Sequence, residues 1–315
     1  MINYLPYTGT LTCADRSLEV NSIVPVNIAH ITCNVSYVFR SLDGSCNNLD
    51  KPWWGQPSTP FKRLLKSSYD DDLSMPRSHS VTGVLLPDPR QLALKIHNSN
   101  GKVSETKFSS FLALFGQFIS HDLSLTDQVE NTSNDRLCRC TRDANKLDKN
   151  CIPILIPRED TLNADQDCYE VLRSRPLGSK EFHQFYNKTT NKRQQLNSVT
   201  HWLDLSQVYG SSSIINSIRA HKHGLLKSKS SQSGETYLPY KSKNCSLTQD
   251  TPCFLSGDGR VNNNILLVSI HTLFLREHNR IARSLVAGGL AWNDERIFQT
   301  ARKIVSLTYK LFYLK

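Results

Sequence analysis

The chain has 315 residues, of which 38% are hydrophobic and 21% are charged, and its formal net charge is +10 at pH 7. This composition excludes an intrinsically disordered chain, and the length suffices for one large domain with a substantial core. No stretch reaches the roughly 18 consecutive apolar residues of a membrane span, so we expect no membrane-spanning segment.

Residues 1–32 form an N-terminal segment without the basic region and apolar core of a signal peptide. The cysteines number nine and have loop-like spacing, without the repeated CxxC pairs of a structural zinc site. Together with Asn-x-Ser/Thr sequons, they indicate an oxidising environment. We therefore expect an extracellular or secretory-pathway protein with an incomplete N-terminus; the sequons begin at Asn34, Asn131, Asn187 and Asn244.

Residues 47–107 contain many prolines and glycines, which predicts a long irregular segment over a core, with helices only after it. The first predicted helix covers residues 108–122, with an apolar face formed by Phe108, Phe111, Leu112, Phe115, Phe118 and Ile119.

Gln117 and His121 lie four residues apart on a different face of this helix. A neutral imidazole both accepts and donates protons near pH 7, so this pair could hold a water or peroxide and move a proton. The alternative is a histidine that is only a satisfied core or surface residue.

Oxygen-bearing side chains occupy Thr200, Asp204 and Ser206, and Trp202 offers a backbone carbonyl between them. Such a set could wrap Ca²⁺, which takes six to eight oxygen ligands, and Asp122 could add a carboxylate from the helix. The alternative is a short strand or turn with its polar side in water.

A basic segment follows, rich in serine and nearly free of aromatic residues. It resembles a solvated loop more than a base-stacking surface, so we expect no specific nucleic-acid binding, while contact with acidic glycans stays open. Its basic residues are Arg219, His221, Lys222, His223, Lys227, Lys229, Lys241 and Lys243.

Arg260 ends a glycine-rich turn that leads into a second predicted helix, residues 265–284. A fixed arginine there could stabilise negative charge on a leaving oxygen, although it could also be a surface cation. His271 and His278 are seven apart, which excludes the HExxH spacing of a zinc protease. The residues predicted to point inward are Leu266, Leu267, Ile270, Leu273, Phe274 and Ile281.

A third helix is predicted from Asp294, as its N-cap, to the end of the chain. No C-cap precedes Lys315, so we expect the domain to continue beyond this sequence. Its apolar stripe comprises Ile297, Ala301, Ile304, Val305, Thr308, Leu311 and Phe312.

These segments, in this order, resemble the animal haem peroxidase family, the group of myeloperoxidase, peroxidasin and thyroid peroxidase. The resemblance implies a mainly α-helical fold with long loops and little sheet, incomplete at the C-terminus, with residues 33–315 as the distal half of the domain. It further implies disulfides Cys33–Cys46 and Cys245–Cys253, and two more among Cys138, Cys140, Cys151 and Cys168, with Cys13 left over.

The resemblance also assigns roles to residues. His121 would be the distal histidine, Arg260 would stabilise the charge that develops as the O–O bond breaks, and Gln117 would position peroxide or halide. The metal ligands would be Asp122, Thr200, the Trp202 carbonyl, Asp204 and Ser206. Ser120 and Asn263 stand where the family commonly has haem-ester carboxylates, and Asn264 cannot make the methionine link of one branch, so covalent haem attachment is not expected.

The family's proximal histidine is expected downstream of this sequence, so peroxidase activity is not expected from this chain alone. The first hypothesis is a secreted haem peroxidase, or a fragment of one, with haem b and Ca²⁺, using hydrogen peroxide to oxidise a small donor or halide in connection with oxidative stress. The second is a non-enzymatic, calcium-stabilised extracellular binding or adhesion module. A third, a basic glycan-binding protein, depends on charge alone.

Overall fold

A computed structural model describes residues 31–34, 36–97, 106–127, 150–160, 167–177, 192–212, 214–241 and 253–314. Among the regular elements of these ranges, helices contain most of the residues and the strands form two-residue antiparallel pairs only, so the predicted mainly α-helical fold with little sheet is confirmed. The pairs are β1 (Thr59–Pro60) with β4 (Leu196–Asn197), β2 (Ile154–Leu155) with β3 (Cys168–Tyr169), and β5 (Lys229–Ser230) with β6 (Thr236–Tyr237).

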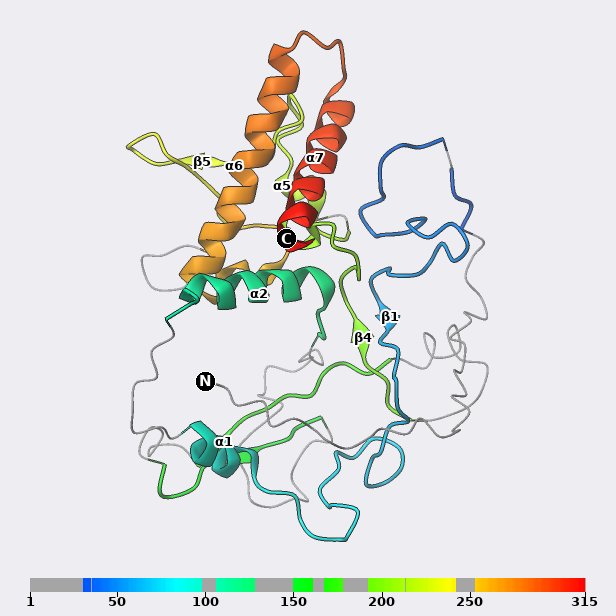
Figure 1. Ribbon diagram of the computed structural model, residues 1–315, viewed down its shortest axis with the longest axis vertical. Coiled ribbons are helices and arrows are strands. Elements are labelled where there is room, and N and C mark those ends of the chain that lie inside the picture. Colours follow the sequence, from blue (N-terminus) through cyan, green and yellow to red (C-terminus); the bar gives the residue numbers. More distant parts are fainter. Residues whose placement is uncertain are drawn as a thin grey trace.

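Two long helices, α6 (Ile265–Ala287) and α7 (Asp294–Leu314), stand side by side as an antiparallel hairpin, and α2 (Ser110–Leu123) crosses near one end of it (Figure 1). Phe118 of α2 stacks on Phe274 of α6 with ring centroids 5.2 Å apart, and Tyr309 of α7 meets Phe118 edge-on at 6.0 Å. These aromatic contacts pack α2, which carries Gln117, His121 and Asp122, against α6 and α7. Shorter helical segments complete the described elements: α4 (Ser206–Tyr209), α5 (Ile215–Ile218) and the 3₁₀ turn η2 (Gly259–Asn263).

The third helix begins near Asp294 as predicted, but the prediction that Asp294 is its N-cap is wrong. Asn293 caps α7, since its Oδ1 accepts from Arg296 N at 2.9 Å, while Asp294 is the first helical residue. Asp294 instead accepts from Gly224 N at 2.6 Å and pairs with Arg219 at 2.8 Å. Asn and Asp are equally good N-caps, so the sequence alone could not choose between these neighbours.

The expectation that helices begin only after residue 107 is also wrong, because α1 covers Pro89–His97. Asp88 Oδ1 accepts from the backbone N–H groups of Arg90 and Gln91 at 2.8 and 3.0 Å. A capping aspartate followed by proline at the first helical position is a helix-start signal, which the abundance of proline and glycine around it concealed.

The predicted apolar faces of the three long helices contain more residues than the structure buries. Phe118, Leu267, Ile270, Ile281, Ile297, Ala301 and Val305 are buried as expected. Other members of the same apolar stripes are exposed, because periodicity identifies a stripe but not whether another element covers it. In the described part of the chain, the exposed members are Phe108, Phe111, Leu112, Leu266, Leu273, Ile304, Leu311 and Phe312.

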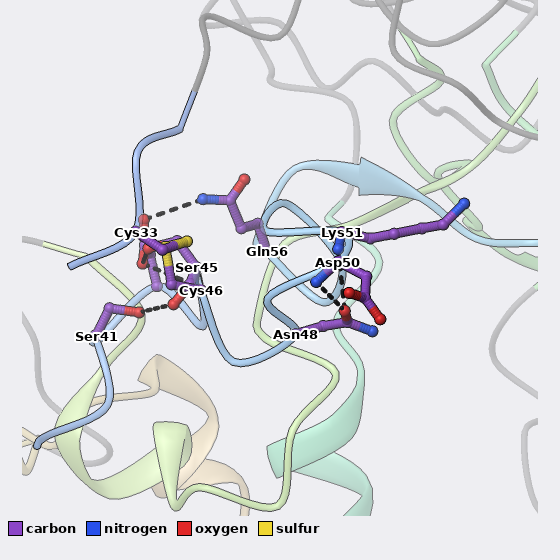
Figure 2. Close-up of a disulfide and its surroundings, with 9 residues drawn as sticks. Cys33, Ser41, Ser45, Cys46, Asn48, Asp50, Lys51 and Gln56 are labelled. Atoms are coloured by element: carbon purple, nitrogen blue, oxygen red, sulfur yellow. Dashed lines mark hydrogen bonds between the residues drawn. A yellow bond between two sulfur atoms is a disulfide. The ribbon is translucent and has the colours of Figure 1, made fainter. Parts of the chain in front are cut away.

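The predicted disulfide Cys33–Cys46 is present, and hydrogen bonds from nearby loop residues surround it (Figure 2). Cys151, Cys168 and Cys253 are also disulfide-bonded. Cys13, Cys138, Cys140 and Cys245 lie outside the described residues, as do the sequons at Asn131, Asn187 and Asn244. Among the described residues, no helix is long and apolar enough to cross a membrane.

Candidate functional site

The turn that carries Arg260 is fixed against α4 through backbone contacts. Gly257 N donates to Val208 O and Asp258 N to Gln207 O, each at 3.0 Å. A Cβ on Gly257 would lie 2.2 Å from Gly210 N, so only glycine permits this approach. The glycine-rich sequence therefore places Arg260 beside the end of α2.

The guanidinium of Arg260 is held on three sides. Its Nε and Nη2 both donate to the Asp258 carboxylate, and the bond from Nη2 is 2.7 Å long. Nη2 also donates to the His121 carbonyl at 3.0 Å, and Nη1 donates to the Ser124 carbonyl at 2.9 Å. Burial opposes ionisation of Asp258, yet hydrogen bonds and charge from Arg260 hold its pKa below the usual value. Arg260 is therefore an anchored cation next to His121 rather than a freely solvated surface residue.

His121 is buried in the last turn of α2, with 6% of its surface exposed. Burial first, and then the charge of Arg260, lower the pKa of its imidazole. Its Nδ1 is buried and has no hydrogen-bond partner among the described residues. The imidazole is thus neutral at pH 7 and has a free nitrogen.

A second buried histidine, His271 of α6, lies within electrostatic range of His121, Asp258 and Arg260. Ser256 Oγ donates to Gln207 O at 3.1 Å, so it accepts from His271 Nδ1 at 2.8 Å. The proton of the neutral imidazole is therefore on Nδ1. His271 Nε2 is then a buried acceptor without a partner among the described residues. Burial lowers the pKa of His271 to about 3, so it stays neutral. The sequence motif offered no reason to assign Ser256 or His271 to the site.

Gln117, one turn before His121, is half-buried and accepts a hydrogen bond from Asn264 Nδ2 at 3.1 Å. Ser120 and Asn263, the positions without haem-ester carboxylates, are both exposed. The structure therefore places Arg260 against the last turn of α2, which carries His121, and places Asn264, the N-cap of α6, against Gln117 one turn earlier.

The predicted metal-ligand residues also meet, where the loop of Asp204 contacts the last turn of α2. Asp122 accepts from Ser206 N at 2.7 Å and from Ser206 Oγ at 3.0 Å, while Asp204 accepts from Thr200 Oγ1 at 3.0 Å and from Ser206 N at 3.0 Å. All four residues are buried. The loop is thereby joined to the helix through hydrogen bonds to Asp122, the residue that the sequence suggested as a further carboxylate for a cation.

The backbone between Asp204 and Ser206 is unusual. Leu205 has φ +63°, a left-handed conformation that costs a non-glycine residue on the order of 1 kcal/mol. Leu205 is fully buried, and its N–H donates to Asp122 Oδ2 at 3.2 Å. This strained turn lets the backbone N–H groups of residues 205 and 206 both reach the Asp122 carboxylate.

Asp122 and Asp204 form a buried pair of like charges. Burial raises the pKa of Asp122 well above its usual value, and the charge of Asp204 raises it further. Burial likewise raises the pKa of Asp204, although Arg302 partly offsets this. Such a pair accommodates either a proton or a cation. The remaining predicted ligand, the Trp202 carbonyl, accepts from Asp204 N at 2.9 Å and so stays in the same turn.

Residues 39–313 match the family model described as animal haem peroxidase. The chain is 33% identical to chorion peroxidase of Aedes aegypti over 292 residues, which is 89% of this chain and 36% of that protein. It is 34% identical to peroxidasin homolog pxn-1 of Caenorhabditis elegans, over 86% of this chain and 23% of that protein. The chain thus spans about a third or less of these curated relatives.

Solved structures share the fold. Peroxidase A from Dictyostelium discoideum aligns with a TM-score of 0.63 at 24% identity, covering 87% of this chain and 51% of that one. A fatty acid alpha-dioxygenase of Arabidopsis thaliana aligns with a TM-score of 0.62 at 21% identity, covering 91% and 38% of the two chains. At these identities the likeness concerns the fold alone.

Proposed function

Because this chain belongs to the animal haem peroxidase family, we propose that residues 33–315 supply the distal side of a haem peroxidase site that oxidises a small donor or halide with hydrogen peroxide. The main support is the position of Arg260, a charge anchored at 3.0 Å from the backbone of a buried, neutral His121. Haem b, when bound, would supply the iron at which the peroxide O–O bond is cleaved.

The three residues have the chemical properties that the distal side of a haem requires. His121 would accept a proton from peroxide and return it to the leaving oxygen, which requires the neutral imidazole that burial favours. Arg260 would stabilise the negative charge on that oxygen, since its guanidinium is already fixed by Asp258 and two carbonyls. Gln117 would orient the peroxide or halide. None of the residues assigned here would hold the iron itself.

Haem binding tests this proposal. Titration of the purified protein with haemin and added imidazole should give a Soret band that is shifted from that of the same mixture without protein, and this shift should change in His121→Ala. His223→Ala, an exposed histidine in the basic segment, is the matched control and should behave like the unchanged protein. A Soret band identical to that of the protein-free mixture, or a shift that is insensitive to His121→Ala, would contradict a distal haem site.

We further propose a Ca²⁺ site formed by Asp122, Thr200, the Trp202 carbonyl, Asp204 and Ser206. The support is a buried cluster of oxygen atoms with two carboxylates, of the kind that hard cations prefer. A cation would relieve the repulsion between the carboxylates and would join the loop more firmly to α2.

Calcium should therefore raise the melting temperature, measured by differential scanning fluorimetry after removal of metal by a chelator. Asp204→Asn keeps an oxygen for Ser206 N and Thr200 but removes one charge, so the calcium-induced rise should be largely lost. An Asp258→Asn control changes a buried aspartate that lies outside the cluster. Equal calcium responses of Asp204→Asn and the unchanged protein would exclude this site.

The second candidate function is a non-enzymatic, calcium-stabilised binding or adhesion module. Exposed Ser120 and Asn263 in place of haem-ester carboxylates, beside an intact cluster of buried oxygens, favour it. A calcium response without any haem binding would support this alternative over the first. The disulfide Cys33–Cys46 and the exposed sequon residue Asn34 support an extracellular location for either function.

A further inference from the structure

The side chain of Asn264 makes two hydrogen bonds whose polarity is fixed. Asn264 is the N-cap of α6, and Leu267 N lies 2.8 Å from its Oδ1. A backbone N–H only donates, so the atom that faces it must be the amide oxygen of Asn264. The nitrogen Nδ2 therefore points the other way, toward Gln117, and lies 3.1 Å from Gln117 Oε1.

The same reasoning extends to Gln117. Asn264 Nδ2 is a donor, so the Gln117 atom that meets it must be the oxygen Oε1. The nitrogen Nε2 then faces away from Asn264 with both of its hydrogens. The orientation of the Gln117 amide is thus set by a backbone N–H three residues beyond Asn264, at the start of another helix.

We propose that Asn264 is a positioning residue that holds Gln117 with its NH₂ group toward the distal side. Gln117 then meets a ligand as a hydrogen-bond donor, which favours ligands that accept hydrogen bonds, such as a peroxide oxygen or a small anion. The identity of that ligand rests on the proposed peroxidase function, whereas the amide orientation does not.

The test is to reverse the polarity at position 264 while keeping the cap. Asn264→Asp has the same shape and still offers an oxygen to Leu267 N, but its second oxygen can only accept. The Gln117 amide must then turn so that Nε2 donates to the carboxylate introduced by this substitution. In ¹⁵N-labelled protein without haem, the side-chain amide protons of Gln117, assigned by their loss in Gln117→Met, should shift downfield and exchange more slowly with solvent.

Asn263→Asp is the matched control, because it adds the same charge one residue away at an exposed position. It should leave the Gln117 signals unchanged. If Asn264 only caps α6, Asn264→Asp will keep the melting temperature and will also leave the Gln117 signals unchanged. That result would overturn the proposal. Because the measurement is made without haem, a failure of the protein to bind haem would not change its outcome.

A second measurement covers the case in which Asn264→Asp does not fold. Asn264→Ala should lower the melting temperature less in a Gln117→Met background than in the unchanged protein, because the bond between the two amides is already absent there. The cap is lost equally in both backgrounds. Equal losses of melting temperature would show that the two side chains are not coupled and would refute the proposal.

Discussion

At the scale of single residues, the buried histidines show how burial fixes a protonation state. His278 of α6 is fully buried, with Nδ1 2.9 Å from the Tyr209 hydroxyl and Nε2 2.9 Å from Gly224 O. The carbonyl can only accept, so Nε2 carries the proton and Nδ1 accepts from Tyr209. Burial lowers the pKa of His278 from 6.5 to about 4, so this neutral tautomer persists well below pH 7.

His278 should therefore make the protein less stable in acid. The unfolded chain binds this proton near pH 6.5 and the folded chain only near pH 4, so the contribution is complete above pH 6.5 and is lost as pH falls toward 4. The expected loss is on the order of 3 kcal/mol. Urea unfolding at several pH values should show a shallower pH dependence in His278→Gln. An exposed control, His223→Gln, should retain the full slope; a parallel slope in His278→Gln would refute this assignment.

At the scale of secondary-structure elements, side chains at the helix ends decide both the boundaries and the site. Asn264 caps α6 and orients Gln117, while Asp258 caps η2 and anchors Arg260. The motif around Arg260 could be recognised in the sequence. The contacts that Asn264 and Asp258 make beyond capping could not be recognised in the sequence, because they depend on the proximity of α2, more than 100 residues earlier in the chain.

The start of α7 provides a test at this scale. Asn293→Ala should destabilise the protein by about 1 kcal/mol, the usual cost of losing an N-cap, whereas Asn293→Asp should be neutral. Chemical denaturation followed by circular dichroism would measure both. If Asn293→Ala has no effect, the cap assigned to Asn293 is wrong and Asp294 becomes the candidate again.

At the scale of the whole molecule, α2 and α7 each expose part of their apolar face to solvent. Phe111 and Leu112 of α2 and Leu311 and Phe312 of α7 are each more than half exposed, with Phe312 at 69%. Val305, which the sequence assigned to the same stripe of α7, is buried. Exposed apolar surface of this kind promotes association between molecules.

Phe312→Ser should therefore reduce self-association without lowering the melting temperature. Size-exclusion chromatography with light scattering, over a range of protein concentrations, would measure the change. Val305→Ala, a buried position in the same helix, should instead destabilise the protein by roughly 1–3 kcal/mol without improving solubility. Unchanged association of Phe312→Ser would show that the molecules do not associate through this face.

The sequence by itself determined the family, the helical class and the residue types of both clusters, because these depend on local periodicity and on motifs such as Gly257-Asp258-Gly259-Arg260. It also suggested Asp122 as a further carboxylate for the loop of Asp204. Only the tertiary structure decided which parts of each apolar stripe are covered, that His271 lies near His121 and is hydrogen-bonded to Ser256, and that Asn264 orients Gln117. The physical reason is that burial and hydrogen-bond polarity depend on the neighbours that other segments provide, and a local pattern contains no information about them.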